Sequence, residues 1–359
     1  MMKWSKIMLL AMVVFAMLGL MPAFAQPVCG DLSRDDCILL QNAQQATTNL
    51  NSAGFKATVE FDFGISFFPD MLNLRMVADG VYTRVPVTRQ DIEADYRPLY
   101  SLNADMTVFL EGETSELIQP TDNTFTTTFD LRYVDGVGYA DLSKILPLMS
   151  LSRGSWYSVD MTDFLTKLIR DGIFPSDTIA IMTMLFGSDY IGALALDGTL
   201  HRADDIQTDS QTFAVFEGIF SFGDYLDDNP IIFSSLVVGW ELSIRDFMPN
   251  SNYTDAEIRR AAEFYAEWFR ALDFNMVQTV GLDDGYVHQT QFEMIFAPEI
   301  TTTLNPDPLG LALFGSIELR FLADFRYTQF GNVPLIIKPE QSSPLRYEDI
   351  FGDGNNSLF

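Results

Sequence analysis

The chain has 359 residues, of which 48% are hydrophobic and 13% aromatic, and its formal net charge is −27 at pH 7. This much apolar material excludes a disordered acidic polymer and is enough for a large buried core, in one domain or two. The strongly negative surface repels phosphate groups, which argues against nucleic acid as a partner and against docking on anionic head groups.

The first 25 residues have the pattern of a secretory signal peptide. Lys3 and Lys6 precede an uncharged apolar run over residues 7–20, and an Ala-Phe-Ala triplet ending at Ala25 offers small residues for cleavage. A retained membrane anchor is the alternative, although the run is shorter than the roughly 20 residues of a span. We expect an exported protein, whether periplasmic, extracellular or associated with the cell envelope. Loss of Lys3 and Lys6 would change the net charge from −27 to −29.

The sequence has two cysteines, Cys29 and Cys37, just after the predicted cleavage site. In an oxidising compartment, a pair at this spacing predicts one disulfide that pins the mature N-terminus to the first turn of a helix. Lipid attachment at Cys29 is the alternative, but the preceding Gln26-Pro27-Val28 does not resemble a lipobox.

The first third of the mature chain predicts one helix followed by strands. Ser33 and Asp36 mark a helix start, apolar residues recur at helical spacing up to Leu50, and we place the helix end at Gly54. From residue 55 the period changes to two, with one apolar and one polar face. Strands are predicted over residues 55–67, 72–78, 106–110, 125–133 and 137–139, with turns at Pro69-Asp70, Asp79-Gly80 and Asp135-Gly136. Strands joined by tight turns are antiparallel.

The middle of the chain is predicted to be largely helical. Residues 156–160 predict a short strand, and residues 161–172 and 176–185 predict helices. Residues 187–250 mix apolar runs with acidic loops, where periodicity does not separate helix from strand. We interpret residues 161–250 as a helical middle region.

The last third repeats the order of helix and strands. Thr254 and Glu257 form a capping box at the start of a helix that continues to Leu272, which we expect to pack on a sheet. Strands are predicted over residues 274–281, 286–296 and 317–328, with a hairpin at Asp283-Asp284-Gly285 and an irregular acidic tail over residues 339–359. We expect residues 26–338 to form a single enlarged domain, with a loose duplication as the alternative.

Few residues point to catalysis. His201 falls in a predicted loop and His288 in a predicted strand, where we interpret it as structural. The acid pairs fall in turn-like segments and are interpreted as solvated: Asp204-Asp205, Asp227-Asp228 and Asp283-Asp284. No zinc-ligand spacing, nucleophile motif or phosphate-binding loop occurs. We therefore expect no enzyme, no metal and no cofactor. An extracellular hydrolase would need two facing carboxylates, which nothing in the sequence indicates.

Four segments carry a resemblance to a known superfamily. They are GFKATVEFDF at residues 54–63, SLNADMTVFL at 101–110, TFDLRYVDGVGY at 128–139 and GSWYSVDM at 154–161. A leading helix followed by these long alternating strands resembles the LolA/LppX-like superfamily of exported carriers of lipids and lipoproteins. The resemblance covers residues 36–161 and, more weakly, 254–330. The chain departs from the superfamily in its length, its extra middle region and its missing lipobox.

The resemblance implies an α+β fold: a strongly curved antiparallel β-sheet, or half-barrel, with helices covering the concave apolar face and an apolar cavity between them. In this sequence the predicted inward faces are rich in Phe and Met, whose large side chains suit an adaptable pocket. The predicted cavity residues are Phe61, Phe63, Ile65, Leu74, Met76, Val108, Phe129, Leu131, Tyr265, Trp268, Phe269, Phe292, Met294, Leu319 and Phe321.

The function expected from these patterns is binding or carriage of a hydrophobic small molecule or lipid, without catalysis. Transient contact with a membrane or with an envelope protein is part of this expectation. The alternative is a structural or protein-interaction component of the cell envelope, with the same fold but a filled core and exposed aromatic patches.

Overall fold

The computed structural model of the protein describes residues 32–65, 68–92, 97–114, 124–141, 156–170, 200–208, 210–248, 252–298 and 316–347. The predicted signal peptide, Cys29 and the helix predicted at residues 176–185 lie outside these residues. Cys37 is buried in the first turn of its helix and is disulfide-bonded. Its predicted partner lies outside the described part, so the pairing with Cys29 stays a prediction.

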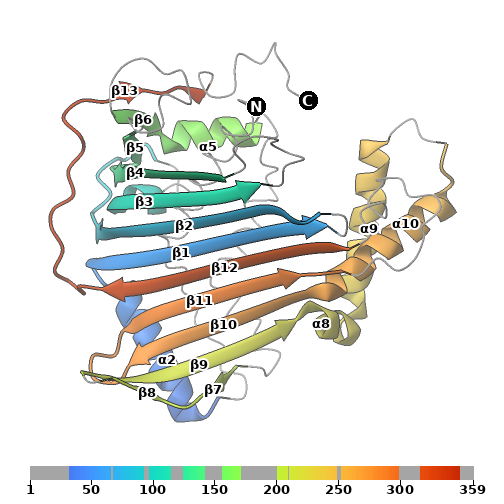
Figure 1. The fold of residues 1–359 in the computed structure, drawn as a ribbon, viewed down its shortest axis with the longest axis horizontal. Coiled ribbons are helices and arrows are strands. Elements are labelled where there is room, and N and C mark those ends of the chain that lie inside the picture. The colour runs from blue at the N-terminus through green and yellow to red at the C-terminus, as the bar shows by residue number, and fades with distance from the viewer. Residues whose placement is uncertain are drawn as a thin grey trace.

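One open sheet of 13 strands organises the described residues (Figure 1). The first meander runs through β1 (Ser52–Ile65), β2 (Phe68–Arg84), β3 (Leu102–Thr114), β4 (Thr124–Val134), β5 (Val137–Asp141) and β6 (Trp156–Asp160). The second runs through β9 (Thr212–Ser221), β10 (Leu272–Gly281), β11 (Val287–Phe296) and β12 (Ile317–Thr328). β1 pairs with β12 from Gly54↔Thr328 to Ile65↔Ile317, and this pairing joins the two meanders into one sheet.

Three two-residue strands complete the sheet. β7 (His201–Arg202) and β8 (Ile206–Gln207) pair with β9, whereas β13 (Ser343–Pro344) pairs with β6. The β13–β6 pair is parallel, so the sheet is mixed rather than purely antiparallel as expected from the sequence. It also corrects the prediction of an irregular tail, because Leu345 N–H donates to the Ser158 carbonyl at 2.8 Å.

The helices flank this sheet. They are α2 (Arg34–Thr48), α3 (Arg97–Tyr100), α5 (Met161–Arg170), α8 (Phe222–Asp228), α9 (Pro230–Phe247), α10 (Asp255–Trp268) and the short 3₁₀ helix η2 (Phe269–Ala271). Figure 1 shows α2 and α5 near opposite edges of the sheet, and α8, α9 and α10 beyond the strand ends on one side. The fold is therefore α+β, as the sequence predicts.

Both predicted helix starts are confirmed at the level of their caps. Ser33 Oγ accepts from the Asp36 N–H at 3.2 Å. Thr254 Oγ1 accepts from the Glu257 N–H at 3.3 Å, while the Glu257 carboxylate accepts from the Thr254 N–H at 2.8 Å. These bonds satisfy amide groups that a helix cannot pair internally, which is why the capping residues mark the first turn in the sequence.

Several predicted breaks are wrong because the strands run through them. Asp79-Gly80 and Pro69-Asp70 lie within β2, and Gly54 lies within β1 rather than at the end of α2. The reason at Gly80 is steric, since a Cβ there would lie 2.4 Å from the Asp105 carbonyl oxygen. Glycine is needed there because a neighbouring strand approaches closely, not because the chain turns. Asp135-Gly136, in contrast, is the predicted hairpin, with φ of 53° and 80°.

The helical middle region is also corrected. Strand β9 and the short strands β7 and β8 lie within it, ahead of α8 and α9. Ala214, Val215 and Phe216 of β9 are all buried, so its first half, residues 213–216, is a continuous apolar run rather than an alternation. A short run of this kind is compatible with a buried helix or a buried strand, which is why periodicity fails there.

Candidate functional site

The apolar face of the sheet is the site that the sequence predicts, and strand register makes it one continuous surface. Leu74, Phe61, Phe321 and Met294 occupy consecutive paired positions on β2, β1, β12 and β11. The neighbouring row runs through Met76, Val59, Ala323 and Phe292 in the same strand order, and Phe63 pairs with Leu319 in the next row. Because side chains alternate between faces along a strand, these rows share one face. The predicted one-sided sheet is confirmed across the β1–β12 junction.

Three packed clusters cover parts of this face. The first lies over β1–β6 and includes Met76, Val108, Phe129 and Leu131, with Met161 and Phe164 of α5 packed on it. The second lies over β9–β11, where Leu40 and Ala43 of α2 pack among Phe216, Phe274 and Met276, with Phe292 and Met294 at its margin. The third joins α9 and α10.

Tyr265, Trp268 and Phe269 belong to the end of the sheet rather than its centre. Tyr265 and Trp268 are buried in the cluster between α9 and α10, whose contacts with strands are through Phe296 and Ile317. The Phe269 ring lies 6.2 Å from that of Phe296. The predicted helix thus has α9 as a close neighbour and reaches the sheet at its strand ends.

Four predicted residues lie between these clusters. Phe61, Phe63, Ile65 and Leu319 are partly accessible to solvent and belong to none of the three clusters formed by the described residues. We name these four residues the central strip. Figure 1 places their strands, β1 and β12, in the middle of the sheet. Large apolar side chains that stay partly accessible favour the uptake of further apolar surface, at about 25 cal/mol per Å² buried.

Buried polar groups on the apolar face escape prediction from the sequence. Gln44 of α2 donates to the Gln278 side chain of β10 at 3.0 Å, and Gln278 donates to Thr290 at 3.2 Å. Thr47 accepts from the Val287 N–H at 2.8 Å, which fixes α2 on the second meander. Such bonds join residues distant in the sequence, so no local pattern predicts them.

The opposite face of the sheet carries cross-strand ion pairs. Arg75 Nη1 lies 2.9 Å from Glu111 and its Nε 3.3 Å from Glu60, and the hydrogen bond to Glu111 helps to raise the Arg75 pKa above its usual value. Arg320 Nε lies 2.7 Å from Glu293. Burial opposes ionisation of Glu293, but its hydrogen bonds from Arg320 and Asn275 outweigh this and lower its pKa.

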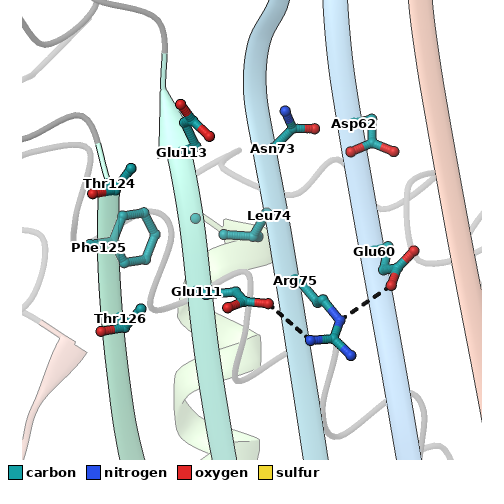
Figure 2. Close-up of a pocket in the computed structure, with 11 residues that line it drawn as sticks. Glu60, Asp62, Asn73, Leu74, Arg75, Glu111, Glu113, Thr124, Phe125 and Thr126 are labelled. Atoms are coloured by element: carbon teal, nitrogen blue, oxygen red, sulfur yellow. Dashed lines mark hydrogen bonds and ion pairs between the residues drawn. The ribbon is translucent and has the colours of Figure 1, made fainter.

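A groove of about 360 Å³ crosses this charged face over β1–β4. Figure 2 shows Arg75 between Glu60 and Glu111. Gly112, which also lines the groove, pairs with Leu74 on β2 and with Phe125 on β4, so these two side chains belong to the apolar row of Phe61. A Cβ on Gly112 would lie 2.5 Å from the Phe125 ring, so glycine is required where these two apolar side chains converge. The described lining holds no histidine or cysteine. Arg75 pairs with two of its carboxylates, Glu60 and Glu111, whereas Asp62 and Glu113 also line the groove, so the lining stays net negative. The groove offers hydrogen bonds and charge but no nucleophile paired with a base.

The predicted structural role of His288 fits its surroundings. Its Nε2 lies 2.8 Å from Asp284, and its ring meets those of Phe213 and Phe330 edge-on at 5.0 and 4.9 Å. His201 lies in β7 rather than in a loop, 3.8 Å from Glu217. One member of each predicted acid pair has a side-chain partner: Asp205 and Asp227 form ion pairs with Arg202 and Arg270, and Asp284 is hydrogen-bonded to His288.

Two further findings for the described residues concern metal-binding groups and membrane-spanning helices. No group of three or more His, Cys, Asp or Glu side chains among them is placed to hold a metal ion. Among the described helices, none combines the length and the apolar character needed to cross a membrane.

Comparison with known proteins adds little to this geometry. No protein-family model matches the chain, and no curated protein matches it. A solved structure concerned with lipid–protein interactions in lipovitellin is similar with a TM-score of 0.29 and 7% identity over 80% of this chain. The chain spans 26% of the lipovitellin chain. The resemblance to the LolA/LppX-like superfamily stays a prediction.

Proposed function

We propose that the protein is an exported, non-enzymatic carrier that binds a hydrophobic ligand, such as a lipid, on the apolar face of its sheet. In this proposal the sheet curves around the ligand as a half-barrel, and the helices cover its concave side. The observation that carries the proposal is the central strip, where Phe61, Phe63, Ile65 and Leu319 stay partly accessible between three packed clusters.

The physical reason is the cost of leaving such a surface in water. An ordinary domain buries its aromatic side chains in one contiguous core, and accessible aromatic side chains at the centre of a sheet indicate a surface that receives another apolar body. The first cluster, with α5, and the second cluster, with α2, lie on either side of the central strip. They stabilise the sheet, and neither includes a residue of the central strip. A ligand on the central strip would gain burial without unfolding either cluster.

The alternative function is a structural or protein-interaction component of the cell envelope. It is favoured by the charged face, where ion pairs such as Arg75–Glu111 and Arg320–Glu293 form a rigid polar surface. In that case the apolar face serves only as a core, and neither lipid content nor lipid uptake is expected.

The test is lipid binding by the purified mature chain. Organic extracts analysed by mass spectrometry should contain reproducible lipid, and the stripped protein should take up a fluorescent fatty acid. The variant pair Phe63→Gln and Leu319→Gln, which replaces two residues paired across β1 and β12, should weaken uptake at least tenfold. Lys56→Gln is the matched control, because Lys56 is exposed on the opposite face of β1, and it should bind like the parent.

Circular dichroism and thermal melting separate lost binding from lost folding. A folded double variant without uptake supports the proposal. If the parent protein yields no lipid and takes up no fatty acid, the carrier function is wrong and the structural alternative is favoured. If the double variant binds as well as the parent, the ligand does not lie on the central strip.

A further inference from the structure

Helix α9 exposes a row of apolar side chains to solvent. Ile231, Val238 and Leu242 are 79%, 51% and 59% exposed, and their spacing of seven and four residues places them on one face of the helix. Figure 1 shows α9 beyond the strand ends, away from the two sheet edges. We name these three residues the α9 ridge.

The opposite face of α9 is firmly packed. Val237 and Ile244 are buried in the cluster with Ile258 and Tyr265 of α10. The Trp240 ring lies 5.3 Å from the Tyr265 ring. The α9 ridge is therefore held in a fixed orientation on the same cluster that contacts the sheet through the ends of β11 and β12.

The polar groups beside the α9 ridge are satisfied within the helix. The hydroxyls of Ser234, Ser235 and Ser243 donate to the carbonyls of the residues four positions earlier, at 2.9, 2.9 and 3.0 Å. Residues 230–240 contain no charged side chain. Because the hydroxyl hydrogen of each serine is already bonded to the helix backbone, the part of this face within residues 230–240 can leave water at a low cost in hydrogen bonds.

We infer that α9 docks on the surface of an electrically neutral lipid layer, with the α9 ridge inserted at the boundary between head groups and acyl chains. Protein–protein interfaces ordinarily contain about one hydrogen bond per 100–200 Å². The serine hydroxyls on this face already donate to carbonyls of α9, so they offer a protein partner few hydrogen bonds. Helix α8 carries Asp224 and Asp228 just before α9, besides Asp227, which pairs with Arg270, and the charges of Asp224 and Asp228 oppose anionic head groups.

The charges of α9 itself set its orientation. Glu241, Arg245 and Asp246 lie in the C-terminal half of the helix, so α9 lies along the interface instead of entering it end-on. This inference rests on the proposed function in one respect: docking would bring the end of the apolar sheet face to the layer from which a lipid ligand is taken or to which it is delivered.

The experiment is flotation of the full mature chain with phosphatidylcholine vesicles. The parent should float with the vesicles, and the triple variant Ile231→Ser, Val238→Ser, Leu242→Ser should partition at least tenfold more weakly. The matched control is Ile219→Ser, Leu335→Ser, Ile337→Ser, whose three parent residues are 56%, 82% and 63% exposed elsewhere on the molecule. This control should float like the parent, because we attribute vesicle binding to the α9 ridge and not to exposed apolar residues in general.

Other outcomes would overturn the inference. Docking on a lipid layer is wrong if the parent does not float, if the α9 triple variant floats equally well, or if the control loses binding to the same extent. A dimer of the free protein, detected by light scattering and abolished by the triple variant, would assign the α9 ridge to a second copy of the chain. Uptake of a fluorescent fatty acid from solution by the triple variant tests the carrier function separately, and it should equal that of the parent.

Discussion

Two tyrosine side chains on the apolar face are buried with hydroxyl groups that have no hydrogen-bond partner among the described residues. They are Tyr82 of β2 and Tyr133 of β4, which lie on either side of Ala104 in the sheet. An unpaired buried hydroxyl costs about 1–3 kcal/mol of folding free energy. Tyr100 differs, because its hydroxyl bonds to Arg89 at 3.1 Å and to Thr162 at 3.0 Å.

We predict that Tyr82→Phe and Tyr133→Phe each leave the free energy of unfolding unchanged or raise it by about 1 kcal/mol, because the phenyl ring stays and an uncompensated polar atom is removed. Tyr100→Phe should instead lower it by about 1–2 kcal/mol, since it removes a hydroxyl that is paired. Urea titrations at neutral pH measure all three. A clear loss of stability in Tyr82→Phe would show that its hydroxyl is paired in solution.

The same burial predicts how stability depends on alkaline pH. Burial raises the pKa of both Tyr82 and Tyr133, against an ordinary value near 10 in the unfolded chain. A group whose folded pKa is raised stabilises the fold fully below the unfolded pKa, and this contribution is lost as pH rises toward the folded value. Stability should thus fall above about pH 10, by about 1.4 kcal/mol per pH unit for each such phenol.

Replacing both tyrosines with phenylalanine should make that alkaline slope shallower, as measured by urea titrations between about pH 9 and pH 11. The Tyr100→Phe variant serves as the comparison, since it also removes one phenol. An identical slope in the parent and the double variant would mean that neither hydroxyl is buried in solution.

At the scale of single elements, alternation and capping predict most strands and helix starts, but some glycine residues lead to wrong predictions of turns and helix ends. The sequence predicts a turn at Gly80, whereas this residue sits in the middle of β2, where β3 approaches closely. Gly239 of α9 is the opposite case, because a Cβ added there would have no atom within 4 Å. The sequence shows that a residue is glycine, but the distance from that residue to a neighbouring strand is defined only in the folded sheet. The role of such a glycine therefore cannot be predicted from the sequence alone.

We predict that Gly80→Ala and Gly239→Ala change stability in opposite directions. Gly80→Ala should cost about 1–3 kcal/mol, because its Cβ would lie 2.6 Å from the Met106 Cβ and the strands must move apart. Gly239→Ala should add about 1 kcal/mol, because alanine favours the helix and meets open space. Thermal melting of both variants checks this. A neutral Gly80→Ala would mean that β2 and β3 are farther apart in solution than in this structure.

At the scale of the whole molecule, the sequence predicts the two faces of the sheet but not the order of its strands. Period-two alternation places Phe61 and Phe321 on apolar faces, yet it says nothing about β1 pairing with β12 from the other end of the chain. The central strip cannot be separated from ordinary core residues for the same reason. Which part of an apolar face stays uncovered depends on where α2, α5 and α10 pack, and that is a long-range property.

The C-terminal segment shows how long-range contacts complete the fold. After β12 the chain passes along the strand ends to the far edge of the sheet, where β13 joins β6 (Figure 1). Tyr347 is buried there, with its ring 5.8 Å from that of Phe164 of α5. The segment therefore closes the cluster over β1–β6 and ties the second meander to the outer edge of the first.

We predict that Tyr347→Ala lowers the free energy of unfolding by about 3–5 kcal/mol, because it removes a large buried aromatic side chain from the cluster that holds α5. Leu335→Ala, in the same segment but 82% exposed, should change it by less than about 0.5 kcal/mol. Urea titration measures both, and hydrogen exchange locates the effect. Amides of β6 and α5 should exchange faster in Tyr347→Ala than in the parent. Amides of β9 and β10 should stay protected, because α2 is bonded to Gln278 and Val287 and stabilises the second meander independently. Uniform loss of protection across the sheet would instead mean that the two halves unfold together and that the segment supports the whole molecule.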